Sequence, residues 1–241
     1  MQIERYQSSG RQGFSGCSCG LITIGGGIIL AIMVVLIAPA LPSLGLRLAG
    51  FQPIESPINL STPEPIPIIN SAQTTSQVIL SAGSFGQRTI NQSSAYTMQV
   101  GTDDNNRNTA QISMTEGGIL TVCEQYTDLC TATGDRFRNV AVDLQNNQAT
   151  ISGEAFIPNL NTWQSLSVIV SLTDTHEIIV NGVEVNGTLF AIPDSELGQQ
   201  LRDIETNANQ ALRQLTLQSN GETYRLSDIT ITETQLVATF R

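Results

Sequence analysis

The feature that most constrains this chain is an uncharged, apolar run near its start. Residues 21–38 read LITIGGGIILAIMVVLIA, in which only Thr23 is polar, and no charged residue occurs from 12 to 46. As a helix this run is about 27 Å long, close to the hydrocarbon thickness of a bilayer. A single span must be helical, because lipid offers its backbone no hydrogen bonds. Pro39 and Pro42 follow and end a helix. We therefore predict a transmembrane anchor at residues 21–42.

A cleaved signal peptide is the alternative interpretation of this run. The run starts late and is long for a signal core, and the Ala-Pro-Ala at 38–40 is a poor cleavage site. Arg5 and Arg11 against Glu4 give the short N-terminal tail a positive charge, which favours a cytoplasmic N-terminus. The predicted location is the cytoplasmic membrane, crossed once, with the bulk of the chain outside it (periplasmic or at the cell surface).

Composition divides the rest of the chain. Seven of the nine prolines lie between residues 39 and 67, where their fixed φ favours an extended, stiff spacer. The isoleucines among them also allow packing along a partner, or collapse as a linker. The predicted organisation is a cytoplasmic tail (1–20), the anchor (21–42), a Pro-rich stalk (43–70) and an extracytoplasmic head (71–241).

Charge excludes several classes of partner. The head carries the whole formal net charge of −10, and all eleven positive residues of the chain are arginines without a basic stripe. This pattern argues against a nucleic-acid partner and against attachment by charge to anionic headgroups. The single histidine, His176, leaves little for histidine-based catalysis or a His-rich metal site.

The head reads as α+β. Apolar and polar residues alternate along several segments, which is typical of antiparallel strands covered on one face. One long amphipathic helix follows 193–196, and a weaker one begins at 115–116. We expect a mainly antiparallel β head with the long helix packed on a curved sheet. The predicted strands are 77–82, 88–100, 108–114, 139–144, 149–156, 165–172, 177–185, 226–232 and 235–240.

The long helix carries the candidate ligand-binding residues. Apolar residues recur along it at spacings of four and three, which makes a narrow stripe. Two of them are alanines, whose small side chains leave room beside a sheet. That room is either a groove for an apolar ligand or simply close helix–sheet packing. The stripe consists of Leu197, Leu201, Ile204, Ala208, Ala211 and Leu215.

Short phrases in the head resemble a known family. They occur at 114–116 (MTE), 140–142 (VAV), 149–153 (ATISG), 183–187 (VEVNG), 192–193 (IP), 209–212 (NQAL) and 226–232 (LSDITIT). In this order they resemble the LmeA-like family of bacterial exported phospholipid-binding proteins, relatives of the tubular lipid-binding (TULIP-type) fold, over about 108–241. The resemblance implies a helix wrapped by a curved sheet, an apolar groove for acyl chains, and no catalytic residues. The stalk and 71–101 lie outside it, and the narrow stripe departs from it.

Four cysteines have different interpretations. Cys123 and Cys130 are a disulfide candidate, because both would be oxidisable in an exported head. A continuous helix would hold them about 10 Å apart, too far for a bond, so a disulfide requires the helix to end before Cys130. Two buried thiols are the alternative. Cys17 and Cys19 precede the span, and we interpret them as small residues at a helix entrance.

Other polar groups give thin evidence for chemistry. His176 and Asp174 fall in a predicted turn without a serine or cysteine signature, so a catalytic triad is not expected. Residues 103–106 (DDNN) lack the spacing of a calcium loop and predict a hairpin turn instead. Trp163 is predicted to be a core or rim aromatic residue. We therefore expect no enzyme, no metal and no cofactor.

Two functions remain as expectations. The first is a membrane-anchored, non-catalytic module that binds membrane lipid or another apolar ligand. The second is a single-span accessory or scaffold subunit of a larger membrane complex, with other subunits of that complex as partners. The sheet-plus-helix pattern favours the first, and the stalk and the Gly-rich span favour the second.

Overall fold

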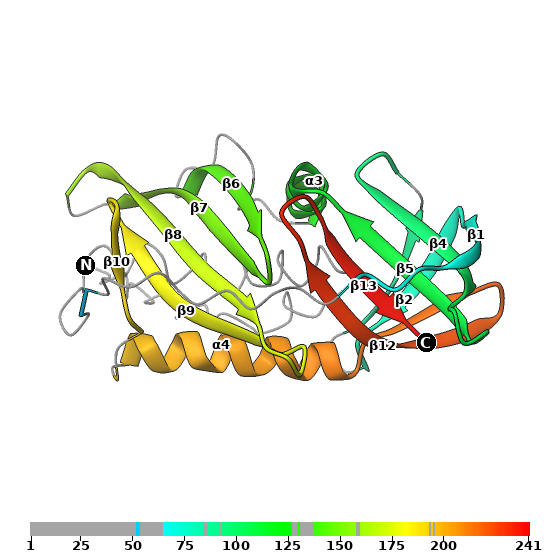
Figure 1. Ribbon diagram of the computed structural model, residues 1–241. Coiled ribbons are helices and arrows are strands. Elements are labelled where there is room, and N and C mark those ends of the chain that lie inside the picture. Colours follow the sequence, from blue (N-terminus) through cyan, green and yellow to red (C-terminus); the bar gives the residue numbers. More distant parts are fainter. Residues whose placement is uncertain are drawn as a thin grey trace, which may run out of the picture.

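The computed structural model describes residues 52–53, 65–83, 86–91, 93–126, 130, 137–157, 160–192, 194 and 196–241. In these ranges the chain forms antiparallel strands in two sheets and two helices, α3 (Glu116–Tyr126) and α4 (Glu196–Arg213). Figure 1 shows the sheets next to one another along the molecule, with α4 running beneath them. The expected α+β class, with a β-rich head, is confirmed for the described residues.

The larger sheet has eight strands. Its order is β1-β4-β5-β13-β12-β11-β2-β3, so strands from the two ends of the head are neighbours. β13, for example, pairs with β5 through Ala238 and Ile112. The strands are β1 (Asn70–Thr74), β2 (Gln77–Ser81), β3 (Gln87–Asn91), β4 (Tyr96–Thr102), β5 (Asn108–Met114), β11 (Thr216–Ser219), β12 (Glu222–Ile231) and β13 (Leu236–Phe240).

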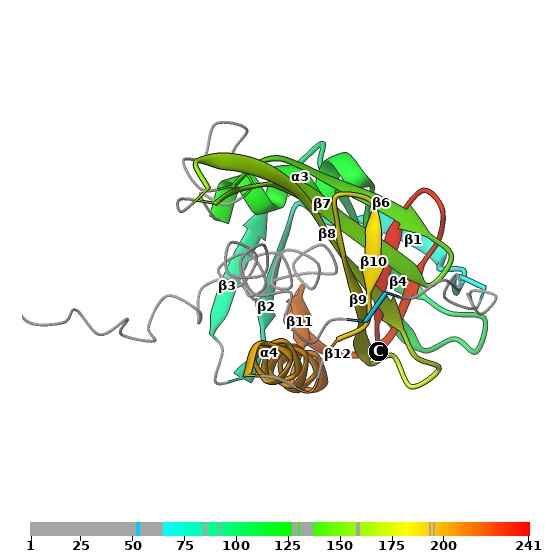
Figure 2. The ribbon, with the colours of Figure 1, turned by 90° about the vertical axis from the view of Figure 1, so that its left-hand side faces the viewer.

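The smaller sheet has five strands in the order β10-β9-β8-β7-β6, joined mostly as hairpins. Viewed end-on, the sheets curl like part of a barrel above α4 (Figure 2). In β8 both Ser167 and Ile169 are buried, although they lie on the opposite face from Val168. The face that we expected to be exposed to solvent is therefore covered at this point. The strands are β6 (Phe137–Gln145), β7 (Gln148–Ile157), β8 (Thr162–Leu172), β9 (Ile178–Val185) and β10 (Thr188–Phe190).

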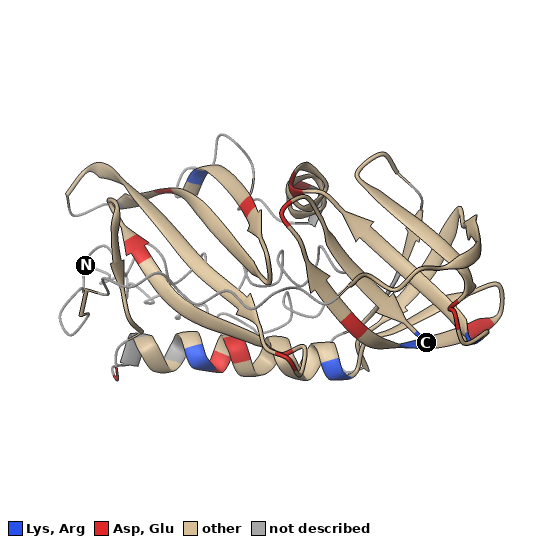
Figure 3. Ribbon diagram, in the orientation of Figure 1, with Lys and Arg blue, Asp and Glu red and all other residues tan. Residues whose placement is uncertain are grey.

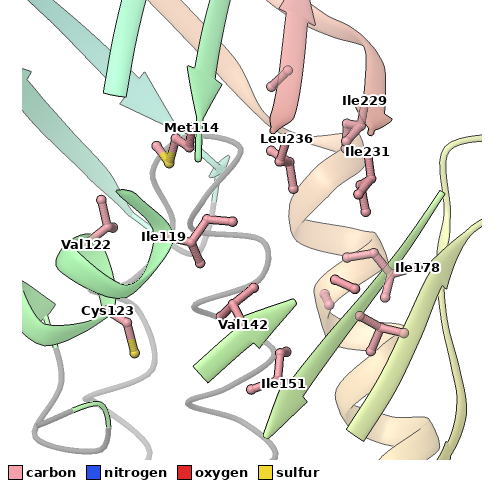
Figure 4. Packing of buried hydrophobic residues seen from close by; sticks show 14 of the residues in the cluster. Met114, Ile119, Val122, Cys123, Val142, Ile151, Ile178, Ile229, Ile231 and Leu236 are labelled. Atoms are coloured by element: carbon pink, nitrogen blue, oxygen red, sulfur yellow. The ribbon is translucent and has the colours of Figure 1, made fainter. Parts of the chain in front are cut away.

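One apolar core spans both sheets and both helices. Phe240, Leu80, Met98 and Ile112 of the larger sheet are almost completely buried. The same cluster continues through α3 and α4 into β6–β9. Figure 4 shows labelled side chains from α3, β5–β7, β9, β12 and β13 converging where the sheets meet. Burial of this extent is the main stabilising contribution to the fold.

The described parts of the predicted stalk lie on the head. The backbone N–H of Ala191 donates to the carbonyl of Gln52 at 3.0 Å, and Pro53 forms a bridge with Phe190 of β10. Further on, Gln111 Nε2 donates to the carbonyl of Pro67 at 2.7 Å. These contacts bring both described ends of the 43–70 segment against sheets of the head, and residue 70 already belongs to β1.

The predicted tail and anchor, residues 1–20 and 21–42, lie outside the described residues. Of the helices that the structure does describe, neither is long and apolar enough to cross a membrane. Three short strands were not predicted, namely β1, β10 and β11. The predicted strand at 88–100 divides into β3 and β4, which are separated by a bridge and turn at 93–95.

Candidate functional site

The inward face of α4 holds most of the predicted ligand-binding stripe. Leu201, Ala208 and Ala211 are buried, and Ile204 is partly buried against the core. Leu215 is also buried but lies two residues beyond the helix. The side chain of Leu197 lies outside the described part. Leu212, which the sequence analysis did not include, is buried as well.

Polar residues on the flank of α4 fix the helix along strand β9. Asn209 acts like a strand partner, because its Oδ1 accepts from the N–H of Ile178 at 2.7 Å and its Nδ2 donates to the carbonyl of Ile178 at 2.9 Å. One turn earlier, Glu205 Oε2 accepts from the N–H of Val180 at 2.9 Å. Arg213 forms an ion pair with Glu177. These contacts set the rotation of the helix and direct its apolar stripe inward.

Sequence reasoning missed this polar flank. Glu205 and Asn209 are spaced i, i+4, the spacing of neighbours on one helix face, and they adjoin the apolar stripe. That spacing could have indicated a polar flank beside the stripe. The partner strand could not be identified from it, because the hydrogen bonds reach about thirty residues back along the chain.

A small polar pocket lies where the two sheets join, and we call it the junction pocket. Asn147, in the β6–β7 turn, donates its N–H to the carbonyl of Ile231 in β12 and accepts from the N–H of Leu172 in β8, both at 2.9 Å. The pocket volume of about 30 Å³ suits one or two water molecules and no acyl chain. It is lined by Asn147, Leu172, Thr173, Asp174, His176, Ile229 and Thr230.

His176 and Asp228 meet across this junction. His176, in the β8–β9 turn, has a φ of 58°, and its Nδ1 lies 3.0 Å from Oδ1 of Asp228 in β12. Asp228 is only 8 % exposed. The turn predicted for His176 and Asp174 is confirmed, but the contact with Asp228 was not predicted. The pair connects the five-stranded sheet to the eight-stranded sheet.

The predicted hairpin turn at 103–106 is confirmed, since it joins β4 to β5. The carboxylate of Asp103 accepts from the side chain and the backbone N–H of Arg107 and from the N–H of Asn105. Hydrogen bonds from Arg107 lower the pKa of Asp103 below its ordinary value of 3.8. These bonds hold the turn closed. Among the described residues, no group of three or more His, Cys, Asp or Glu is arranged to hold a metal ion.

Tyr224 is a second perturbed group in the same sheet. Its hydroxyl donates to Oε2 of Glu222 at 2.7 Å. Burial, together with the neighbouring carboxylate, raises the pKa of Tyr224 to about 12. The phenol is therefore held protonated beside the acid near neutral pH.

The structure joins Cys123 and Cys130 in a disulfide, with Cα atoms 5.7 Å apart. This separation is reached because α3 ends at Tyr126, so the chain leaves the helix before Cys130. Both cysteines are buried. Cys17 and Cys19 lie outside the described residues.

Trp163 lies at the outer end of the β7–β8 hairpin. Its ring is partly exposed, lies 5.4 Å from the ring of Phe156, and carries the Arg138 guanidinium 3.9 Å from its centroid. Arg138 also forms an ion pair with Glu154 at 2.7 Å. The structure thus places this aromatic residue at the rim, one of the two predicted settings.

No protein-family model, curated protein or solved structure matches this chain.

Proposed function

We propose that this chain is a membrane-anchored, extracytoplasmic, non-catalytic module that binds a lipid or another apolar ligand along the inward face of α4. The observation that carries the proposal is that α4 has two faces with different contacts. Its polar flank is fixed to β9 by Glu205 and Asn209, and its apolar stripe faces inward.

The chemistry of that face suits an acyl chain. Leu201, Ala208 and Ala211 are apolar and buried on the inward face, and the alanines are the smallest side chains that still favour helix. An acyl chain gains about 0.8 kcal/mol for each methylene that it buries, so little polar recognition is required. The resemblance to the LmeA-like, TULIP-type lipid-binding proteins supports the same ligand class.

The location is part of the proposal. The apolar run at 21–38 is long enough to anchor the chain in a cytoplasmic membrane, with the N-terminus inside. The Cys123–Cys130 disulfide supports a head outside the cytoplasm, because such bonds persist in oxidising compartments.

The test is ligand binding by the full chain in detergent, using phosphatidylcholine with a fluorescent acyl chain as the probe. We expect saturable binding that weakens about tenfold, or about 1.4 kcal/mol, when Ala208→Phe places a large side chain on the inward face of α4. Asn207→Phe is the matched control, because Asn207 is exposed on the same helix. A thermal melt of each variant separates lost binding from lost folding. Equal binding by both variants would exclude the α4 face as the site.

A second function is favoured by exposed apolar side chains. Ile68 and Ile179 are 67 % and 39 % exposed, and large apolar residues at a surface suit protein contacts. We propose as the alternative that the chain is an accessory subunit of a larger membrane complex. Gentle purification at native abundance tests it. Stoichiometric partner subunits would support this function, and a chain that migrates alone would count against it.

A further inference from the structure

At the outer end of the β7–β8 hairpin, one large apolar side chain is exposed and one aromatic side chain is partly exposed. Leu160, in the turn, is 57 % exposed, and Trp163 follows it with one face against Phe156 and Arg138. A tryptophan with an apolar body and a polar N–H is typical of a membrane–water interface. An arginine stacked on the ring extends the same amphipathic character.

This turn lies at the end of the molecule where the chain enters the head. Figure 1 shows the outer end of β7 and β8, strand β10 and the N-terminal end of α4 together at the left-hand end, opposite the C-terminus. The N–H of Asn186, before β10, donates to the carbonyl of Ser165 in β8 at 3.0 Å. Gln52 and Pro53 join β10 at the same end. Figure 2 looks directly onto it.

Chain length limits how far this end can lie from the anchor. The predicted span ends at residue 42, so only residues 43–51 separate it from Gln52. A fully extended chain covers at most about 3.3–3.6 Å per residue, so the tether reaches roughly 30 Å. Gln52 cannot be further than that from the membrane surface. The end of the head that carries Gln52 is therefore held within roughly 30 Å of the bilayer.

We infer that the outer end of the β7–β8 hairpin contacts the phospholipid bilayer through Leu160 and Trp163, which lie in the interface. The inference rests on the anchor in the proposed function. Charge favours a zwitterionic surface over an anionic one, because the head is strongly acidic and the arginines of the described part form no basic stripe (Figure 3). A head held in this way stands with the N-terminal end of α4 toward the lipid.

The experiment uses Trp163, the single tryptophan of the chain, as its own reporter. The full chain is reconstituted in phosphatidylcholine vesicles with and without bromine on the acyl chains, which quench nearby tryptophan. We expect bromine-dependent quenching in the wild type and its loss in Leu160→Glu. Ile68→Glu is the matched control, because Ile68 is also an exposed apolar residue (67 %) but precedes β1 of the other sheet. This variant is expected to be quenched like the wild type.

Flotation of the vesicles after an alkaline wash separates the two ways to fail. A chain that does not float lacks the anchor, which overturns the proposed function and this inference with it. A chain that floats but shows no bromine quenching keeps the anchor and overturns the inference alone. Equal quenching in Leu160→Glu and Ile68→Glu would also overturn it, because Leu160 would then have no part in the contact.

Discussion

The two sheets of the head differ in what lies against their edge strands. In the five-stranded sheet, Glu116 at the start of α3 accepts from the N–H of Leu144 in β6 at 2.9 Å. At the other side, α4 occupies the part of β9 that β10 does not pair. The eight-stranded sheet instead ends in β1 and β3, which are five residues each, and β1 is exposed at every position.

The difference shows two ways to protect a sheet edge. Unpaired edge groups are a template for unwanted strand pairing. The smaller sheet satisfies some of them with carboxylate and amide side chains from helices. The larger sheet has short strands at both edges, whereas the smaller sheet has one at β10 alone among its two edges. The helices of this head are therefore edge partners as well as parts of the core.

The largest effect should come from removing the side chain that replaces a strand. Asn209→Ala leaves the N–H and the carbonyl of Ile178 without their partner, and we expect a loss of about 2–3 kcal/mol in the free energy of unfolding. The measurement is urea unfolding of the full chain in detergent. Asn207→Ala, on the exposed face, corrects for helix propensity and should change stability by less than about 0.5 kcal/mol. Equal losses of unfolding free energy in both variants would show that Asn209 does not stabilise the edge at β9.

The opposite edge should show a smaller loss. Glu116→Ala removes one acceptor, so the N–H of Leu144 loses its bond, and we expect about 1–2 kcal/mol. Hydrogen exchange reports this directly, since the Leu144 amide should exchange faster while neighbours bonded within the sheet do not. Glu124→Ala, exposed on the same helix, is the control. An unchanged exchange rate at Leu144 would mean that α3 does not protect this edge.

The contact between His176 and Asp228 at the junction of the sheets should contribute about 1 kcal/mol to the free energy of unfolding. His176→Asn removes the imidazole that faces Asp228, while asparagine still tolerates the positive φ of this position. A double-mutant cycle with Asp228→Asn isolates the pair. A coupling energy near zero would show that the contact between His176 and Asp228 does not help to join the sheets.

The smallest effect concerns a turn within the larger sheet, far from either helix. The pKa of Asp103 is lowered in the fold, so its charged form stabilises the native state. This stabilisation is present above the ordinary pKa of 3.8 and is lost as the pH falls through the lower, folded value. Asp103→Asn should therefore melt earlier than the wild type at neutral pH. The gap between the two melting temperatures should narrow below about pH 4, and a gap independent of pH would contradict the assignment.

Local patterns predicted many elements and few of their partners. A strand was predicted at 108–114, which is the range of β5, and the predicted stripe from Leu197 to Leu215 covers nearly all of α4. The division into two sheets could not be predicted, because it depends on pairings between distant segments, such as Leu80 with Leu217. Alternation reports which face of a strand is apolar but not which strand lies beside it.

The candidate site shows the same limit. The stripe residues Leu201, Ala208 and Ala211 were predicted from spacing alone. The residues that orient the stripe, Glu205 and Asn209, have ordinary surface chemistry until β9 lies beside them. β1 and β10 were missed because strands of five and three residues carry little alternation. The contact between His176 and Asp228 joins residues 52 positions apart, which no local pattern encodes.

The most direct test of the central claim is native mass spectrometry of the full chain, purified gently in mild detergent and then incubated with phospholipid. A module that binds an apolar ligand along α4 should retain one phospholipid on the chain, and Ala208→Phe should remove that adduct while Asn207→Phe keeps it. A spectrum with only the bare polypeptide, before and after incubation, would contradict the account.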